Sequence, residues 1–277
     1  MASASMSIRF WGVRGSIPCP GPDTVRYGGN TSCVEVRCGE SILVFDAGSG
    51  LRGLGSELTR AGKPTDVDLF LSHCHIDHLL GLPFYVPLFE RGHRIRIWAG
   101  NVGPAGGVRQ AVDKMMSYPL FPVDTGFASA ILEFNDFAPG DALKPRPGIA
   151  VRTAGLNHPG GAIGYRVDYA GRSVAYLTDM EIGDGAIDQT LVNLSQNVDV
   201  LIMDTTYTND ELPSHEGWGH SSWQQGIQLA NAAHAKVLCL FHHDPDHDDG
   251  MMDDIAEAAA RTRAGTIVAK EGLVIDV

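Results

Sequence analysis

The chain has 277 residues, with 33 acidic side chains (Asp and Glu) against 21 basic ones (Lys and Arg), which gives a formal net charge of −12. A hydrophobic fraction of 44% supplies enough apolar material for a core and excludes a disordered chain. The acidity disfavours a protein that grips nucleic acid through a broad basic face. The sequence has no apolar run near the ~18 residues of a transmembrane helix, so we expect no membrane association.

The N-terminal residues, MASASMSIRFWG, lack the basic segment and apolar stretch of a signal peptide, so we expect a cytoplasmic protein. The five cysteines are odd in number and show no paired CxxC spacing, which favours reduced thiols over a disulfide framework. The length and the lack of a low-complexity linker indicate a single domain over residues 1–277.

Short β-branched or aromatic runs predict strands at 8–13, 33–37, 42–45, 67–71, 94–99, 150–154, 164–169, 173–177, 198–203, 236–241 and 273–277. Helical periodicity predicts helices at 51–61, 78–91, 108–118, 189–195, 222–235 and 252–264, with a capping box formed by Ser221 and Gln224. This alternation is typical of an α/β protein whose sheets are covered by helices. The Pro- and Gly-rich segment 16–29 predicts a functional loop, and residues 119–147 predict an irregular insertion or lid over a site.

The motif His73-Cys74-His75-Ile76-Asp77-His78 directly follows the predicted buried strand 67–71. His73 and His75 alternate along an extended chain, so both rings can point the same way. Imidazole and carboxylate groups suit zinc, iron or manganese. One strand end therefore offers four metal ligands within six residues, although isolated histidines at a strand end can also be ordinary polar surface residues.

Three further polar residues each follow a predicted strand: His158, Asp179 and His242. Ligands carried at strand ends are a common way for α/β proteins to build a site on a rigid sheet. Taken singly, each residue also fits a loop histidine or a helix cap. His243 and His247 compete with His242 as the last ligand, and we prefer His242 because it comes first after the strand.

This ligand set resembles that of the metallo-β-lactamase fold superfamily, and the resemblance covers almost the whole chain. The resemblance implies an αββα four-layer sandwich with two divalent metal ions, zinc by preference and manganese or iron(II) as alternatives. It assigns one metal to His73, His75 and His158, and the second to Asp77, His78 and His242, with Asp179 bridging the two. Asp46, in the segment LVFDAGSG, would orient the ligand histidines.

The segments FWGVRGSIP and YGGNTSC resemble the phosphodiesterase branch of that superfamily, which includes tRNase Z, a phosphodiesterase of phosphonate breakdown and cyclic-nucleotide phosphodiesterases. Gly219-His220-Ser221-Ser222 resembles the Gly-His-Ser-Thr motif of that branch, with Ser222 in place of Thr. The resemblance makes His220 the proton donor to the leaving oxygen, and Asp204 could orient it. Alternatively, His220 merely precedes a helix cap.

Several other side chains are candidate substrate contacts. Arg14 and Arg26 lie in or beside the first long loop, and a guanidinium group fits a phosphate, although each could equally be a solvated charge. Trp218, Trp223 and Tyr207 could stack on a base or fill space in the core.

Two metal ions that share a water molecule lower its pKa and supply a hydroxide nucleophile, with Asp77, His220 and Asp204 as the catalytic side chains. We therefore expect a hydrolase, foremost a phosphodiesterase acting on a small, possibly cyclic-nucleotide, diester. The alternatives are a tRNA 3′-processing endonuclease, a carboxylic ester or lactone hydrolase, and a metal-bound scaffold without activity. The net charge disfavours an extended nucleic acid, and the family resemblance implies a homodimer.

Overall fold

The computed structural model describes residues 5–102, 106–183 and 187–277. In this part of the chain the strands form two seven-stranded sheets, with the orders β14-β1-β2-β3-β4-β5-β6 and β13-β12-β11-β10-β9-β8-β7. The strands of the first sheet are β1 (Met6–Gly12), β2 (Cys33–Cys38), β3 (Ser41–Phe45), β4 (Asp66–Leu71), β5 (Arg94–Ala99), β6 (Ile131–Asp136) and β14 (Val274–Asp276). Those of the second are β7 (Ala142–Arg146), β8 (Ile149–Leu156), β9 (Ala162–Tyr169), β10 (Arg172–Leu177), β11 (Val200–Asp204), β12 (Val237–Phe241) and β13 (Thr266–Val268).

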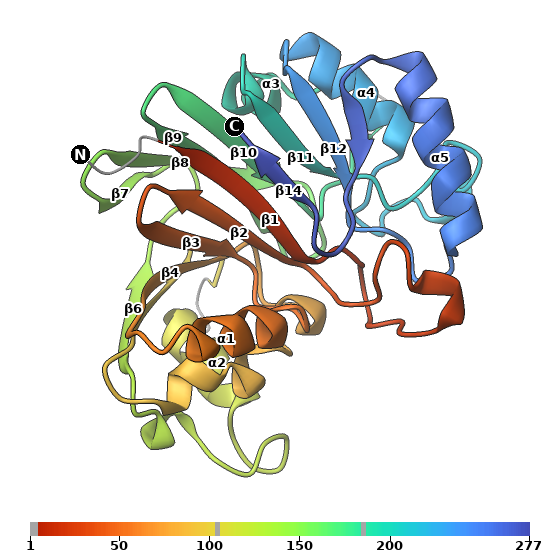
Figure 1. Cartoon of the computed structure of the whole chain (residues 1–277). Coiled ribbons are helices and arrows are strands. Elements are labelled where there is room, and N and C mark those ends of the chain that lie inside the picture. The colour runs from red at the N-terminus through yellow and green to blue at the C-terminus, as the bar shows by residue number, and fades with distance from the viewer. Residues whose placement is uncertain (1–4, 103–105, 184–186) are drawn as a thin grey trace.

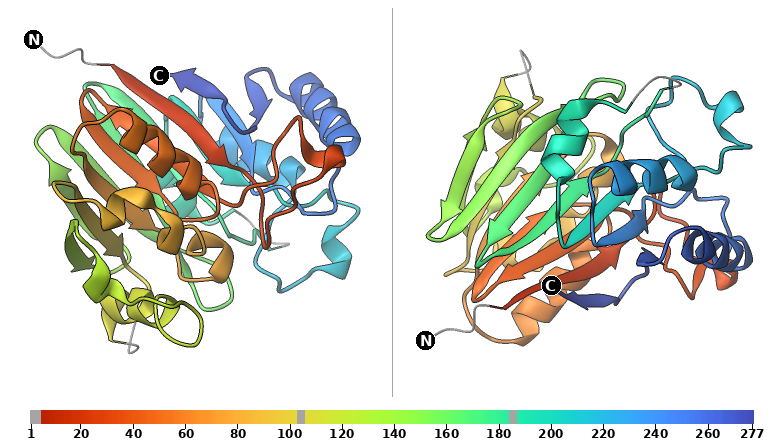
Figure 2. Two further views of the ribbon diagram at one scale, coloured as in Figure 1. Left: turned by 60° about the horizontal axis from the view of Figure 1, so that its bottom comes forward. Right: turned by 90° about the horizontal axis from the view of Figure 1, so that it is seen from above.

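The two sheets pack face to face, and helices cover their outer faces (Figures 1 and 2). Phe45 and Phe70 from the first sheet stack at 5.3 Å between ring centroids and meet Tyr165 and Tyr176 from the second. Outside the first sheet lie α1 (Leu51–Arg60) and α2 (Gly107–Met115); outside the second lie α3 (Gln189–Ser195), α4 (Trp223–Ala232) and α5 (Asp249–Thr262). The αββα expectation is therefore confirmed.

The parallel strands carry the polar residues that the sequence singled out. In the first sheet β3 pairs with β4 in parallel, and in the second β10, β11 and β12 run parallel in consecutive order. The carboxyl ends of parallel strands meet at one edge of a sheet, where α/β proteins bind their ligands. Asp46, His73, Asp179, Asp204 and His242 each follow such a strand end or occupy it.

The predicted helix at 78–91 is wrong. The segment instead forms three short 3-10 helices at Ile76–His78, Leu82–Phe84 and Val86–Phe89. Pro83 and Pro87 explain the difference, because proline lacks a backbone donor and keeps the preceding residue out of the α conformation. The capping box is also shifted by one residue, since Ser222 pairs with Gln225 while the hydroxyl of Ser221 donates to the carbonyl of Met180.

The prediction of an irregular lid at 119–147 is also wrong, because this segment contains β6 and β7, the edge strands of the two sheets. Both are only partly buried, so they lack the strong apolar alternation by which a strand is recognised. The short strand β13 was not predicted either. The remaining predicted strands and helices are observed with small shifts at their ends.

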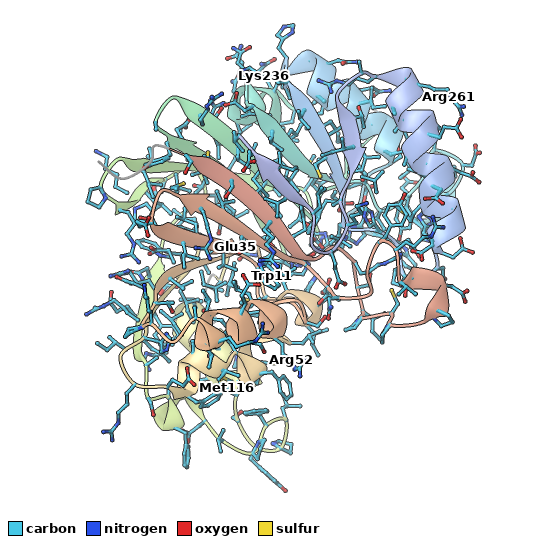
Figure 3. The ribbon with its side chains drawn as sticks, viewed as in Figure 1. Trp11, Glu35, Arg52, Met116, Lys236 and Arg261 are labelled. Atoms are coloured by element: carbon cyan, nitrogen blue, oxygen red, sulfur yellow. The ribbon has the colours of Figure 1, made fainter. Side chains whose placement is uncertain are left out.

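Two long-range links hold the ends of the chain. β1 pairs with both β2 and the C-terminal strand β14. The indole of Trp11, at the end of β1, donates to the carboxylate of Glu35 on β2 at 2.9 Å, and Figure 3 shows the two side chains close together.

No helix of the described residues is long and apolar enough to cross a membrane, and the five cysteines are free thiols.

Arg146 on β7, an edge strand of the second sheet, ties that edge to an inner strand of the first sheet, because its guanidinium contacts Asp66 and Asp68 on β4. Asp68 is fully buried. We expect Arg146→Met to lower the free energy of unfolding by about 2 kcal/mol, since it leaves a buried carboxylate short of its cation. Arg152→Met, which breaks the exposed pair with Asp168, is the matched control and should cost no more than about 0.5 kcal/mol. Urea unfolding measures both, and equal losses would contradict this role.

The same ion pair predicts a dependence of stability on pH. Hydrogen bonds from Arg146 lower the pKa of Asp66 to about 2. Because the pKa is lower in the folded than in the unfolded state, the stabilisation is complete above pH ~4 and is lost as the pH falls toward 2. The stability gap between the native protein and Asp66→Asn should therefore be wider at pH 6 than at pH 3 in urea unfolding. A gap independent of pH would contradict the assignment.

Candidate metal centre

The first group of ligand atoms comes from His73 and His75, after β4, and from His158, after β8. One nitrogen of each ring lies within 4.8 Å of the others. His158 Nε2 lies 3.1 Å from His75 Nδ1, and the rings of His73 and His75 are 4.3 Å apart between centroids. Three imidazole nitrogens thus converge on one point, as the sequence predicted for the first metal.

The second group consists of Asp77, His78, Asp179 and His242, all buried. His78 Nε2 lies 3.1 Å from Asp77 Oδ2, and His242 Nε2 lies 3.5 Å from the same oxygen. The backbone N–H of Ser16 donates to Asp77 Oδ2 at 2.9 Å and so fixes this carboxylate. The structure thus brings together the residues that the resemblance assigned to the second metal.

Asp179 lies between the two groups, and each of its oxygens faces one of them. Its Oδ1 lies 3.8 Å from His73 Nε2 and 3.7 Å from His158 Nε2. Its Oδ2 lies 3.2 Å from both His78 Nε2 and His242 Nε2. This is the arrangement that a carboxylate needs to bridge two cations.

The unpaired atoms of the site fit divalent cations. Among the described residues, the Nε2 atoms of His73, His78 and His242 are buried without a hydrogen-bond partner. Burying such groups unpaired costs free energy, so three of them aimed at the same carboxylate indicate a ligand that accepts nitrogen lone pairs. Neutral imidazole and ionised carboxylate are the ligands of zinc and related ions.

The electrostatics of two members of the cluster, Asp179 and His73, favour the protonation states that bind metal, whereas Asp179, Asp77 and Asp46 outweigh burial and raise the pKa of His78 well above its ordinary value. Burial opposes charge on Asp179, but His242, His78 and His73 outweigh it and hold the pKa of this carboxyl well below its usual range. Burial, reinforced by the neighbouring His78, lowers the pKa of His73 well below its ordinary value. Asp179 is therefore ionised and His73 neutral at neutral pH.

Residues around the ligands fix the orientation of the rings. Asp46 Oδ2 accepts from His78 Nδ1 at 2.8 Å and from the hydroxyl of Tyr176 at 2.7 Å. Ser72 donates to both oxygens of Asp46, and its hydroxyl lies 3.0 Å from His73 Nδ1. Asp46 thus turns the second nitrogen of His78 toward the metal position, as the resemblance implied.

The second ring nitrogens of His158 and His242 also have partners. His158 Nδ1 lies 2.9 Å from the carbonyl oxygen of Gly219, to which it donates, and His242 Nδ1 lies 3.1 Å from the hydroxyl of Thr206. Sequence reasoning missed Ser72, Tyr176 and Thr206. Ser72 had a signal, since it lies beside His73 in the motif. Tyr176 is brought to Asp46 by the packing of the two sheets, and Thr206 is brought to His242 by the pairing of β11 with β12.

His220 lies beside the ligand cluster and is held by Asp204. Its Nδ1 lies 2.7 Å from Asp204 Oδ2, and the other oxygen of Asp204 accepts from Thr206. Burial lowers the pKa of His220, but the Asp204 carboxylate outweighs it and leaves the pKa raised to about 9. A proton is thus retained on a ring that lines the same pocket as Asp179.

The two arginines that the sequence offered as phosphate contacts lie outside the pocket lining. Arg14 is fully buried, and its guanidinium donates to the carbonyl oxygens of Gly28, Asp244 and His247, so it joins loops instead of facing the pocket. Arg26 pairs with Asp249 and Asp253 on α5. Neither side chain lines the pocket, because backbone carbonyls and α5 carboxylates already satisfy them.

The competitors of His242 also point elsewhere. His243 Nε2 donates to the carbonyl oxygen of Ala269 at 2.8 Å, and burial lowers its pKa to about 3. His247 Nε2 lies 2.9 Å from a carboxylate oxygen of Glu211. Of the three candidates, the geometry therefore brings only His242 to Asp77 and Asp179.

Several residues of the site have a strained backbone. Ser16, Asp46, Asp179 and His242 have φ angles of 59°, 62°, 54° and 62°, in the left-handed region that non-glycine residues rarely adopt. Such strain persists only where the surrounding structure imposes it, and it concentrates at functional sites. The sharp turn after each strand directs these side chains back over the strand end.

The pocket above the ligand cluster has a volume of about 460 Å³. It is lined by Ser16, His75, Ile76, Asp77, His158, Pro159, Asp179, Trp218, His220 and His242. Its floor holds the ligand atoms and His220, and its walls include large apolar side chains.

An αββα sandwich with a histidine–carboxylate cluster at its strand ends defines a hydrolase of the metallo-β-lactamase fold. A family model described as "Beta-lactamase superfamily domain" matches residues 42–243, so the chain belongs to that superfamily. Ribonuclease Z of Haloarcula marismortui is 22% identical, over 97% of this chain and 96% of the relative.

Two solved structures are similar over nearly the full length. The metallo-β-lactamase fold protein YhfI from Bacillus subtilis is 19% identical, with a TM-score of 0.73 over 99% of this chain and 100% of that chain. A diphosphatase of the PhnP family is 18% identical, with a TM-score of 0.71 over 99% of this chain and 97% of that chain. Because both sequence identities are below 25%, these two structures show that the fold is shared and nothing further about this chain.

The geometry predicts which histidine binds metal. We expect His242→Asn to lower the metal content of zinc-loaded protein from about two ions per chain to about one, since it removes a ligand of the second group. His247→Asn is the matched control and should keep both ions, because its ring faces Glu211. Elemental analysis after dialysis measures the content, and equal values for the two variants would show that His242 is not a ligand.

Proposed function

We propose that this protein is a dinuclear metal-dependent phosphodiesterase that cleaves small phosphodiesters, with zinc as the preferred metal. The observation that carries the proposal is the position of Asp179 between two ligand groups, beside a histidine that a carboxylate holds at the same pocket. Two divalent cations, when bound, would activate a water molecule and offset charge on the phosphoryl oxygens. His73, His75 and His158 would hold one cation, Asp77, His78 and His242 the other, and Asp179 both.

The chain's own residues supply the proton for the leaving oxygen. Asp204 accepts from His220 Nδ1, which leaves His220 Nε2 as the nitrogen that can face the substrate. An alkoxide leaves poorly unless it receives a proton as the bond to phosphorus breaks. His220 is therefore the proposed general acid, and Asp204 is the residue that positions it and keeps it protonated.

The charges at the site make a small substrate the best fit. Two divalent cations would bring four positive charges against the two carboxylates of Asp77 and Asp179, which leaves a locally positive centre in a chain of net charge −12. Among the residues that the structure describes, those lining the pocket include no lysine or arginine. One reacting phosphate is thus well placed, while the flanking phosphates of a long nucleic acid find no cationic partner in the pocket.

A second candidate function is processing of tRNA 3′ ends, which the full-length similarity to a protein named Ribonuclease Z supports. Purified protein should be incubated with bis(p-nitrophenyl) phosphate and, separately, with a precursor tRNA at low salt. Hydrolysis of the small diester without tRNA cleavage supports our proposal. Cleavage at the tRNA 3′ end favours the second candidate, and metal-loaded protein that cleaves neither contradicts both.

The proposed acid role predicts a dependence on the leaving group. His220→Gln should lower kcat by about 10²- to 10⁴-fold for adenosine 3′,5′-cyclic phosphate, whose leaving group is an alkoxide. The loss should be no more than about tenfold for bis(p-nitrophenyl) phosphate, since p-nitrophenolate leaves without a proton. Steady-state kinetics of both substrates measures this contrast.

Asp204→Asn provides the test of positioning, because it keeps the imidazole but removes the charge that orients it. It should show the same dependence on the leaving group with a smaller loss. His234→Asn, at an exposed turn that does not line the pocket, is the control and should behave like the native protein. Equal losses on both substrates in His220→Gln would rule out an acid role.

A further inference from the structure

Two large apolar side chains at the pocket have no role in the proposed chemistry. Trp218 is 59% exposed and Ile76 is 65% exposed, and both line the pocket above the ligand cluster. Ile76 lies between His75 and Asp77 in the ligand motif, and Trp218 comes two residues before His220. An apolar surface exposed at a pocket is characteristic of a binding site.

The loop that carries Trp218 is held rigidly. The carboxylate of Glu181 accepts from the backbone N–H of Gly217 at 3.1 Å and from that of Gly219 at 2.8 Å, so it clamps the residues on either side of the tryptophan. Both glycines have positive φ angles, 81° and 85°. A Cβ on Gly219 would lie 2.3 Å from His158 Nδ1, so the loop passes directly over a metal ligand.

The indole of Trp218 contacts a neighbouring ring, which is itself held by another. His215 meets Trp218 edge-on at 4.8 Å between centroids, and His215 in turn stacks on Tyr207 at 4.2 Å with an angle of 18° between the planes. Tyr207 is buried and also contacts the ring of His220 edge-on. The indole is thus fixed in place by a layered set of rings, yet more than half of its surface stays open. A fixed, open aromatic ring loses little entropy when a flat group stacks on it.

We propose that Trp218 is a stacking platform for a planar ring of the substrate, with Ile76 as a second apolar wall, so that the preferred substrate is a nucleotide with a single phosphodiester group. The inference rests on the proposed function and names its substrate class. The reacting phosphate lies over the ligand cluster beside His220, and the base contacts Trp218. Because the described residues that line the pocket include no lysine or arginine, further phosphates on the nucleoside would find no such side chain there.

The experiment compares two cyclic diesters that differ in the base. Adenosine 2′,3′-cyclic phosphate and glycerol 1,2-cyclic phosphate share a five-membered ring and an alkoxide leaving group, but only the first carries a planar base. Trp218→Ala should reduce the ratio of kcat/KM for the adenosine substrate to that for the glycerol substrate by about tenfold. Trp218→Phe should retain most of the ratio. Trp223→Phe, at a tryptophan packed against the core, should leave the ratio unchanged.

A binding measurement separates this inference from the proposed function because it needs no turnover. Adenosine monophosphate should quench the fluorescence of the native protein, inorganic phosphate should not, and Trp218→Phe should lose the quenching. If the native protein hydrolyses neither diester, the proposed function fails, whereas quenching still supports the platform. If it hydrolyses both with an equal ratio in Trp218→Ala and shows no quenching, the platform is overturned and the phosphodiesterase stands.

Discussion

The carboxylate of Asp179 is the constraint on which the site depends. It is fully buried, and its two oxygens are each shared by two imidazole nitrogens from different strand ends. A buried carboxylate is unfavourable unless positive charge and hydrogen-bond donors around it compensate for the lost water. The histidines of the first sheet and those of the second therefore meet across one charge, and the two sheets must keep a fixed relative position for the site to exist.

The scaffold achieves that position by turning sharply at the strand ends. Asp46, Asp179 and His242 all adopt left-handed backbone conformations immediately after β3, β10 and β12. The core between the sheets, with Phe45, Phe70 and the two buried tyrosines, holds the strands rigid while the turns remain strained. Tyr176 belongs to both systems, because its ring packs in that core and its hydroxyl bonds Asp46. A change in the packing of Tyr176 in the core would therefore also change the orientation of Asp46 and of the histidine that it holds.

The net negative charge of the chain and the proposed positive charge at the metal centre act on different kinds of anion. Distant surface charges are screened within about 10 Å at ordinary salt, whereas charges in the pocket are not. A net charge of −12 therefore acts mainly on large polyanions, whereas the proposed metal centre would act on the single phosphate of the proposed substrate. The two arginines near the site do not add positive charge to the pocket. Arg14 joins loops, and Arg26 pairs with a carboxylate on α5.

The sequence by itself determined the ligand chemistry and most of the fold. Alternating residues after a buried strand must project together, so His73 and His75 were predictable from spacing alone, and apolar runs located most strands. The errors fall where local pattern is weak: the edge strands β6 and β7 are only half-buried, and two prolines replaced a predicted helix by 3-10 turns.

Only the tertiary structure decided which histidine among His242, His243 and His247 meets Asp179, and that the guanidinium of Arg14 serves the fold. Both outcomes depend on contacts between residues more than 60 positions apart. No local pattern encodes such contacts, because the parallel order of β10, β11 and β12 within one sheet brings His242 to Asp179, and the meeting of the loops after β1 and β12 brings Arg14 to His247.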